Sequence, residues 1–184
     1  MKWIAFFSQT GSEIVNLSNT LGRKPNLLVT NNFELKTKFH PGVRELGVTI
    51  QSAHHDLLMT YFEHQNTFNP ADTLITLHGY LRILPENICN KYSILNGHPG
   101  LITKYPELKG KNPQMEAWVR DYPLIGSVVH KVTPGVDEGE VISEVSYSNR
   151  CESLEEMYGK LKQSSLESWL WVLKQYKDLG CVLE

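Results

Sequence analysis

Short apolar runs recur along this chain of 184 residues, and they constrain its fold more than any other feature. A run that is apolar throughout is typical of a strand buried on both faces of a sheet. The runs are residues 3–7, 27–30, 48–50, 73–77, 92–95 and 124–130. Segments with the apolar spacing of helices lie between several of them. The pattern predicts an α/β fold, with a Rossmann-like, mostly parallel sheet flanked by helices.

The helices are expected where apolar residues recur every three or four positions. Residues 54–65 predict one helix, with two histidines at its start, His54 and His55, facing solvent. Its apolar face is expected to consist of Leu57, Leu58, Tyr61 and Phe62. Residues 113–120 predict a short helix, because proline is favoured at the first helical position.

The end of the chain is expected to form an edge strand and one long helix. Residues 140–147 alternate between apolar and polar side chains, as an exposed edge strand does. Residues 153–177 predict an amphipathic helix that ends at the Asp-Leu-Gly segment 178–180. The apolar face of this helix is expected to consist of Leu154, Met157, Tyr158, Leu161, Leu166, Leu170, Val172 and Leu173.

Composition argues against several classes of protein. A net charge of -2 and the lack of a dense Lys/Arg patch argue against a nucleic-acid partner. No apolar segment has the length of a membrane span, and residues 3–7 are too few for the core of a signal peptide. The three cysteines lie far apart without metal-ligand spacing, which predicts reduced thiols, a cytoplasmic protein and no metal. We expect a single domain over residues 1–184, present as a monomer or weak dimer.

The segment after Leu95 carries the strongest chemical signal. An apolar run stops at Asn96, and Gly97, His98, Pro99 and Gly100 follow. Because side chains alternate along a strand, the amide and the imidazole point to the same side. An amide donates a hydrogen bond to a developing oxyanion, and an imidazole moves a proton near neutral pH. The pair therefore favours acyl-transfer chemistry. The alternative is that Asn96 caps the turn and His98 is a packed loop residue.

Three further candidate segments also follow strand ends, which is where ligands bind in parallel sheets. Residues 10–12, Thr-Gly-Ser, precede a helix, and they either bind a phosphate at its N-terminus or cap it through Ser12. Residues 79–84 place a glycine beside Leu81, Ile83 and Leu84, which either line a ligand site or belong to the core. The turn-rich loop 132–139 carries Asp137, a carboxylate expected to lie near the amide and the imidazole.

In these motifs the chain resembles the folate-dependent formyltransferases, which use 10-formyltetrahydrofolate. The family motif is an Asn-x-His-Pro strand end followed later by a loop of the form Val-x-x-x-x-Asp-x-Gly. The matching segments are residues 96–99 and 132–139, and His130 stands where the family has a strand histidine. Residues 79–84 resemble its Gly-aromatic-x-Arg-Ile-Leu folate segment, and residues 7–12 resemble its substrate-phosphate loop. Within the family, the chain most resembles the enzymes of purine biosynthesis that formylate glycinamide ribonucleotide.

The resemblance implies a role for each of these residues. The implied catalytic residues are Asn96, His98 and Asp137. The implied folate-binding residues are Leu81, Arg82, Ile83, Leu84, Val132 and Val136. The implied acceptor-binding residues are Thr10, Gly11, Ser12 and Glu13. The implied reaction transfers a formyl group from reduced folate to the primary amine of a small metabolite, without a metal.

Several positions depart from the branch that acts on glycinamide ribonucleotide. Glu13 stands where that branch has asparagine, and a carboxylate near a phosphate is unfavourable. The helix at residue 54 starts with two histidines instead of supplying an arginine, and Ser164 and Ser165 stand where that branch has a glutamate. In the unusual loop 106–111, Lys109 and Lys111 either replace the missing charge or belong to a solvated loop. These departures leave two alternatives: a formyltransferase for another amine, such as an amino-sugar nucleotide, or a catalytically silent folate-binding protein.

Overall fold

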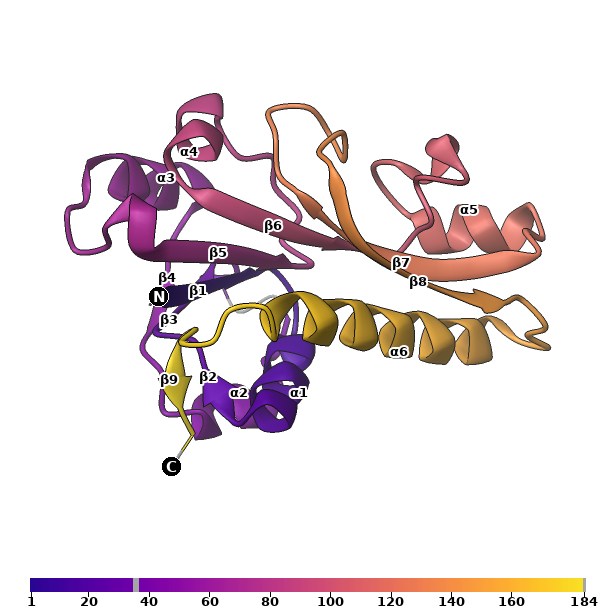
Figure 1. Ribbon diagram of the computed structural model, residues 1–184, viewed down its shortest axis with the longest axis horizontal. Coiled ribbons are helices and arrows are strands. Elements are labelled where there is room, and N and C mark those ends of the chain that lie inside the picture. Colours follow the sequence, from indigo (N-terminus) through magenta and orange to yellow (C-terminus); the bar gives the residue numbers. More distant parts are fainter. Residues whose placement is uncertain (35–36, 184) are drawn as a thin grey trace. The chain divides into compact units, whose positions relative to one another are not determined.

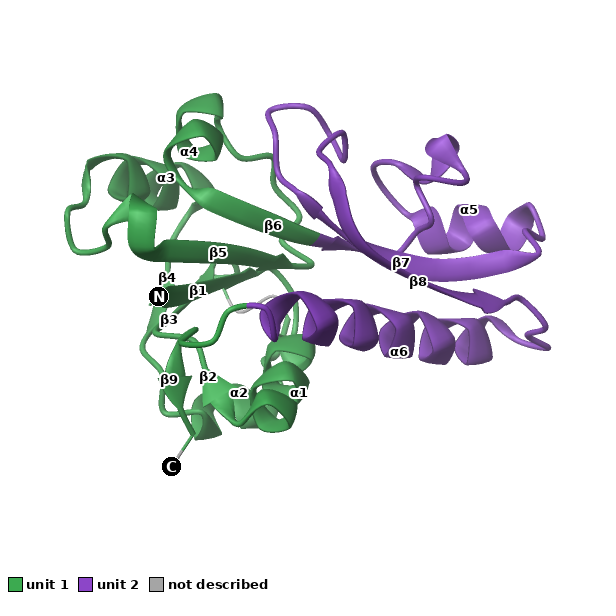
Figure 2. Ribbon diagram, viewed as in Figure 1, with its two compact units in different colours: residues 1–96, 176–184 green, residues 97–175 purple. Residues whose placement is uncertain are grey.

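The computed structural model describes residues 1–34 and 37–183. It divides into two compact units, shown in green and purple in Figure 2. Unit 1 consists of residues 1–96 and 176–184, and unit 2 consists of residues 97–175. The single domain expected over the whole chain stays a prediction.

Unit 1 is built around a parallel sheet with the strand order β4-β3-β1-β5-β6. Parallel pairing joins β1 (Lys2–Phe7) to β3 (Leu27–Thr30) and to β5 (Thr73–His78). It also joins β3 to β4 (Ile50–Ser52). Every residue of β5 and all but the first residue of β1 are buried, as continuous apolar runs predict. β6 (Ser93–His98) begins in unit 1, and its last two residues belong to unit 2.

Helices flank the sheet of unit 1 on both faces (Figure 1). α1 (Ser12–Leu21) and α2 (Pro41–Glu45) contact each other, as do α3 (His55–His64) and α4 (Glu86–Lys91). A short 3-10 helix, η1 (Pro70–Asp72), precedes β5, and β2 (Arg23–Lys24) pairs with β9 (Cys181–Val182). A parallel sheet between helices confirms the predicted α/β fold.

Unit 2 consists of a long hairpin, three helices and the end of β6. β7 (Leu124–Lys131) pairs antiparallel with β8 (Val141–Ser148), and α6 (Leu154–Leu173) packs along both strands (Figure 1). The 3-10 helix η2 (Pro106–Leu108) contacts α5 (Pro113–Val119). The core of this unit contains Ile102, Leu108, Ala117, Ile125, Val128, Met157 and Leu161.

Most predicted elements are present with small shifts, and the differences have physical causes. Helices α2 and α4 lie outside the predicted elements because five and six residues are too few for a visible helical period. The strand predicted at residues 48–50 lies at Ile50–Ser52, because Gly47 still belongs to the preceding turn. The final helix ends at Leu173, several residues before the predicted end.

The buried faces of two helices differ from the prediction. In α3, Leu58 and Phe62 are buried, but Leu57 and Tyr61 are exposed. His55 was expected to face solvent, but it is half-buried and its Nδ1 lies 2.9 Å from the Tyr80 hydroxyl.

Serines replace several expected apolar contacts in α6. Tyr158 is exposed, and Leu154, Leu166 and Leu170 are only half-buried. Ser164, Ser168 and Trp169 are buried instead. The Ser164 hydroxyl lies 2.9 Å from that of Ser127, so small side chains allow the helix to approach β7 closely.

Candidate active site

The end of β6 places the candidate amide and imidazole on a constrained backbone. Asn96 is half-buried, and His98 is 4% exposed. Gly97, between them, lies against the buried indole of Trp169. A Cβ atom at this position would collide with Trp169 Nε1 and would lie 2.9 Å from Cε2. Only glycine therefore fits between the two candidate residues without a shift of α6.

Two acceptors surround the ring of His98. Its Nε2 lies 2.7 Å from the carbonyl oxygen of Leu108, and its Nδ1 lies 3.3 Å from Asp137 Oδ2. A carbonyl oxygen only accepts hydrogen bonds, so Nε2 carries a hydrogen and donates it to Leu108. Nδ1 is therefore the nitrogen that exchanges a proton, and Asp137 lies beside it.

Asp137 lies between two imidazoles. Its Oδ2 accepts a hydrogen bond of 2.8 Å from the backbone N–H of Gly110, and its Oδ1 lies 3.2 Å from Nε2 of His130. The backbone of Asp137 has a φ of 50°, in the left-handed region that few non-glycine residues adopt. Such a conformation at a candidate site indicates that the surrounding contacts determine the orientation of the carboxylate.

The environment of this cluster shifts two of its pKa values. Burial lowers the pKa of His98 below 6.5, and the opposing effects of the Asp137 carboxylate and the Leu108 carbonyl offset only part of the shift. Burial alone would raise the pKa of Asp137. The hydrogen bond from His130, the charge of His98 and the N–H of Gly110 together hold that pKa below its usual value. At neutral pH the site therefore pairs an anionic carboxylate with a neutral imidazole.

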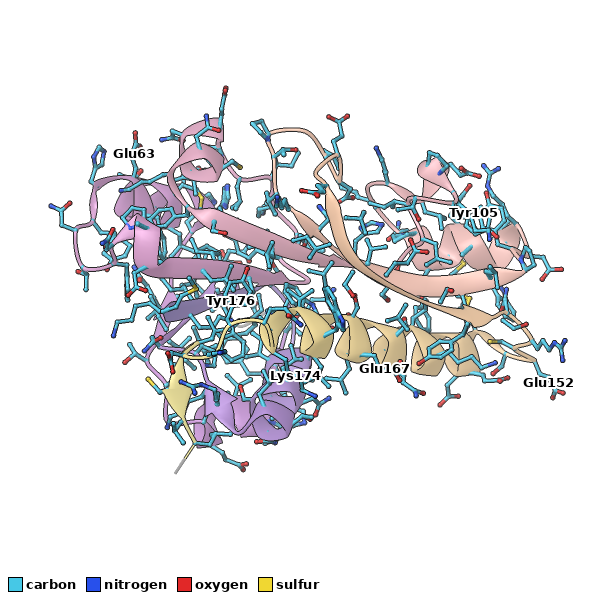
Figure 3. The ribbon with its side chains drawn as sticks, in the orientation of Figure 1. Glu63, Tyr105, Glu152, Glu167, Lys174 and Tyr176 are labelled. Atoms are coloured by element: carbon cyan, nitrogen blue, oxygen red, sulfur yellow. The ribbon has the colours of Figure 1, made fainter. Side chains whose placement is uncertain are left out.

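The loop between β6 and α5 supplies two of the backbone groups in this cluster. Tyr105, labelled in Figure 3, stacks on Tyr122 with ring centroids 4.0 Å apart. Leu108 is 2% exposed and anchors the middle of the loop in the core of unit 2. The Leu108 carbonyl and the Gly110 N–H thus reach the candidate residues from a fixed position. Sequence reasoning missed both groups, because a backbone contact leaves no side-chain signature.

The residues expected to bind folate show mixed exposure. In unit 1, Leu81 and Ile83 are 67% and 66% exposed, and Arg82 is also exposed. The core alternative is therefore wrong for Leu81 and Ile83 and right for Leu84, which is 4% exposed. Two exposed apolar side chains on an irregular segment suit a flat ring ligand.

The residues expected from loop 132–139 belong to unit 2. Val136 is exposed there, and Val132 is half-buried. The same loop supplies Asp137 to the imidazole cluster.

The segment expected to bind the acceptor begins α1 in unit 1. Gly11 is the N-cap, with a φ of 72°, so the alternative of a Ser12 cap is wrong. The Thr10 hydroxyl donates to the Ser12 hydroxyl over 3.1 Å. Glu13 Oε2 lies 2.7 Å from Nδ1 of buried His78, a partner that the sequence did not reveal. Glu13 therefore lies in the first turn of the helix, against an imidazole.

The part of the chain that the structure describes offers neither a metal-binding cluster nor a membrane-spanning helix. In residues 1–34 and 37–183, no group of three or more His, Cys, Asp or Glu side chains could hold a metal ion. Among the same residues, no helix is long and apolar enough to cross a membrane.

Comparisons with known proteins connect these observations to a family. The sequence model of the family described as "Formyl transferase" matches residues 62–172. A phosphoribosylglycinamide formyltransferase of Haemophilus influenzae is 29% identical over 111 residues, which are 59% of this chain and 51% of that protein. A mitochondrial formyltetrahydrofolate deformylase of Arabidopsis thaliana is 28% identical over 108 residues, 57% of this chain and 32% of that protein. The chain thus spans about half of the length of the first of these relatives and about a third of the length of the second.

Solved structures support the fold over a longer stretch. The crystal structure of a phosphoribosylglycinamide formyltransferase from Campylobacter jejuni superposes with a TM-score of 0.80 at 22% identity. The match covers 97% of this chain and 98% of that one. It confirms the predicted Rossmann-like formyltransferase fold.

Proposed function

Because this chain belongs to the formyl transferase family, we propose that it transfers the formyl group of 10-formyltetrahydrofolate to the primary amine of a small metabolite. We expect glycinamide ribonucleotide, an intermediate of purine biosynthesis, to be the acceptor. Residues 1–184 act in this proposal as one catalytic domain of a cytoplasmic protein, present as a monomer or weak dimer.

The contact between His98 and Asp137 is the observation that carries the proposal. The two residues are far apart in sequence, yet the His98 ring nitrogen lies 3.3 Å from the carboxylate. Formyl transfer needs a group that accepts a proton from the attacking amine and returns it to the leaving nitrogen of the folate. A buried imidazole beside an ionised carboxylate supplies this group near neutral pH.

The reaction assigns one task to each catalytic residue. The amine attacks the formyl carbon, and the carbonyl oxygen becomes negatively charged. The Asn96 amide donates a hydrogen bond to this oxygen, an interaction whose loss typically costs about 3–4 kcal/mol. His98 accepts the amine proton on Nδ1 or stabilises the same oxygen, and Asp137 orients the imidazole and stabilises its charged form. The proton then passes to the folate nitrogen as the carbon–nitrogen bond breaks.

The remaining residues bind the two reactants. The exposed apolar side chains of Leu81 and Ile83 fit the ring system of the folate, with Arg82 and Leu84 completing the segment. Val132 and Val136 contribute from the loop that carries Asp137. Thr10, Gly11, Ser12 and Glu13 bind the acceptor, with the hydroxyls and backbone N–H groups of the first turn of α1 as donors.

The contact between Glu13 and His78 favours a second candidate acceptor. A carboxylate in this turn opposes a phosphate and suits hydroxyl groups, which can donate hydrogen bonds to it. An amino-sugar nucleotide offers such hydroxyls beside its amine. We therefore expect an amine of this kind to be formylated if glycinamide ribonucleotide is not.

The test is a turnover assay with the purified chain, 10-formyltetrahydrofolate and each amine, in which the absorbance of the deformylated folate is followed. Acceptor-dependent turnover supports the proposal. Formyl release without an amine would instead identify water as the acceptor, and folate binding without any turnover would support the catalytically silent alternative.

Two variants test the assigned residues. We expect Asn96→Ala and Asp137→Ala each to lower kcat at least about a hundredfold, because each removes stabilisation of the transition state. Asn90→Ala is the matched control, because Asn90 is exposed on α4. Near-normal turnover of either active-site variant, with an unchanged thermal midpoint, would refute the assignment.

A further inference from the structure

We propose that His55 is a positioning residue: together with the Tyr80 hydroxyl, it fixes residues 81–83 in the conformation that receives a flat ring ligand. His55 is the first residue of α3, at a helix start that carries two histidines instead of an arginine. The identification of this ligand as the folate rests on the proposed function, whereas the contacts of His55 do not.

The segment after β5 presents exposed apolar side chains between two buried ones. Tyr80 and Leu84 are 6% and 4% exposed, whereas Leu81 and Ile83 between them are 67% and 66% exposed. Two large apolar side chains thus face solvent on a short stretch whose two ends are fixed in the core. A stretch held in this way loses less conformational entropy on binding a ligand than a mobile loop does.

Ser8, which follows β1, holds the start of this segment. The Ser8 hydroxyl accepts a hydrogen bond of 2.9 Å from the backbone N–H of Leu81, and it donates to Asn31 Oδ1 over 2.6 Å. The backbone N–H of Ser8 also donates to the carbonyl oxygen of Gly79 over 3.3 Å. The ends of β1 and β3 therefore hold the backbone where the exposed stretch begins.

His55 holds the same segment from α3. Its Nδ1 lies 2.9 Å from the Tyr80 hydroxyl, and the two ring centroids are 5.9 Å apart. The His55 ring also forms a hydrogen bond with the backbone of Ile83. Tyr80 in turn packs edge-on against the ring of Phe6 in β1, with ring centroids 5.3 Å apart. His55 therefore connects the start of α3 to residues at both ends of the exposed stretch.

Both groups of the contact between His55 and Tyr80 are uncharged at neutral pH. Burial is the main cause that lowers the pKa of His55 below 6.5, and the nearby Arg82 and His54 act in the same direction. The Asp56 carboxylate opposes this shift but does not cancel it. Burial also raises the pKa of Tyr80. A neutral imidazole therefore faces an undissociated phenol, and one hydrogen bond joins them.

Amide hydrogen exchange tests the proposal without any ligand. The N–H of Leu81 is the reporter, because its bond to Ser8 depends on the position of the segment. We expect Tyr80→Phe and His55→Phe each to raise the exchange rate of this N–H about three- to tenfold, the effect of losing one hydrogen bond. The double variant should add little, because either substitution alone removes the same contact. Unchanged exchange at Leu81 in Tyr80→Phe, or effects that simply add, would overturn the proposal.

Matched variants distinguish this role from a general loosening of the unit. Tyr61→Phe removes a hydroxyl from an exposed tyrosine of α3, and His64→Phe removes an exposed imidazole from the same helix. Neither substitution should change the exchange rate at Leu81. If Tyr80→Phe raised exchange throughout β5 and α3 as much as at Leu81, the pair would have only a general structural role and the proposal would be wrong.

Folate binding tests the consequence for the ligand. In Tyr80→Phe, the Kd for 10-formyltetrahydrofolate is expected to rise about three- to tenfold, and the KM for folate should rise by a larger factor than kcat falls. The KM for the amine acceptor should not change. An unchanged Kd beside faster exchange would overturn the role in ligand binding. Failure of the wild-type chain to bind folate would instead contradict the proposed function, and the exchange result would still decide whether His55 fixes the segment.

Discussion

Replacing Gly97 with alanine tests how tightly α6 is packed against the candidate site. The added Cβ would collide with Trp169 Nε1, and it would lie 2.9 Å from Cε2 and 3.2 Å from Cζ2. The indole is fully buried, so it cannot swing into solvent. Either the helix or the segment from Asn96 to His98 must therefore move.

The size of the effect follows from the cost of overpacking. One extra methyl group in a closely packed core costs about 1–3 kcal/mol. For a chain of this length, each kcal/mol lowers the thermal midpoint by about 2–4 °C. We expect Gly97→Ala to be destabilised within this range. We also expect its kcat to fall at least about tenfold, because small misplacements of catalytic groups lower the reaction rate strongly.

A double-mutant cycle identifies the cause. Trp169→Ala removes the indole that the new Cβ would meet, and by itself it leaves a cavity. In the double variant the methyl group occupies part of that space, so its loss should be smaller than the sum of the two single losses. Gly159→Ala is the control, because a Cβ at Gly159 on α6 meets nothing within 4 Å. Wild-type stability of Gly97→Ala, or simple additivity of the losses in urea unfolding, would refute the packing argument.

Two further predictions concern charge. Glu13→Gln should lower the KM for a phosphorylated acceptor about tenfold, because a carboxylate repels phosphate in this turn. The KM for folate should not change. Glu155→Gln serves as the control, because Glu155 is exposed. An unchanged KM for the acceptor would contradict the prediction. The free energy of unfolding should also fall at acid pH. Below pH 6.5 the unfolded chain protonates His98 more readily than the folded chain does, because the folded pKa of His98 is lowered. Below pH 3.8 Asp137 becomes protonated in the unfolded chain while it keeps its charge in the folded chain. Urea midpoints across this range should fall less below pH 3.8 in Asp137→Asn than in wild type.

The short apolar runs made most of the fold predictable. Continuous runs such as residues 73–77 predict that a strand forms and that both of its faces are buried. The short helices α2 and α4 were not predictable, because their start and end depend on tertiary contacts more than on periodicity. The buried face of α6 was misjudged for a related reason. Hydrophobicity suggests which residues are buried, but serines at 164 and 168 are buried because the helix lies close to β7.

Only the part of the candidate site that consists of side chains was predictable from the sequence. The Asn-x-His-Pro segment and the later aspartate have distinctive residue types and spacing. The sequence therefore identifies His98 and Asp137 as candidate catalytic residues, and the structure places them 3.3 Å apart. The Leu108 carbonyl and the Gly110 N–H, which fix both of them, are common to every residue type. Their role depends on how loop 101–112 folds, and no short pattern encodes that.

The pairing of Glu13 with His78 explains a departure that looked unfavourable in the sequence. A carboxylate in a segment that resembles a substrate-phosphate loop is unfavourable for phosphate when the sequence is considered alone. In the structure its charge lies 2.7 Å from an imidazole whose other nitrogen lies 2.9 Å from the Thr76 hydroxyl, and Trp3 donates to that same hydroxyl over 2.8 Å. A chain of hydrogen bonds from the core to the first turn of α1 thus holds the carboxylate in place. In the acceptor site that we propose at this turn, a carboxylate held in this way should determine which acceptor binds.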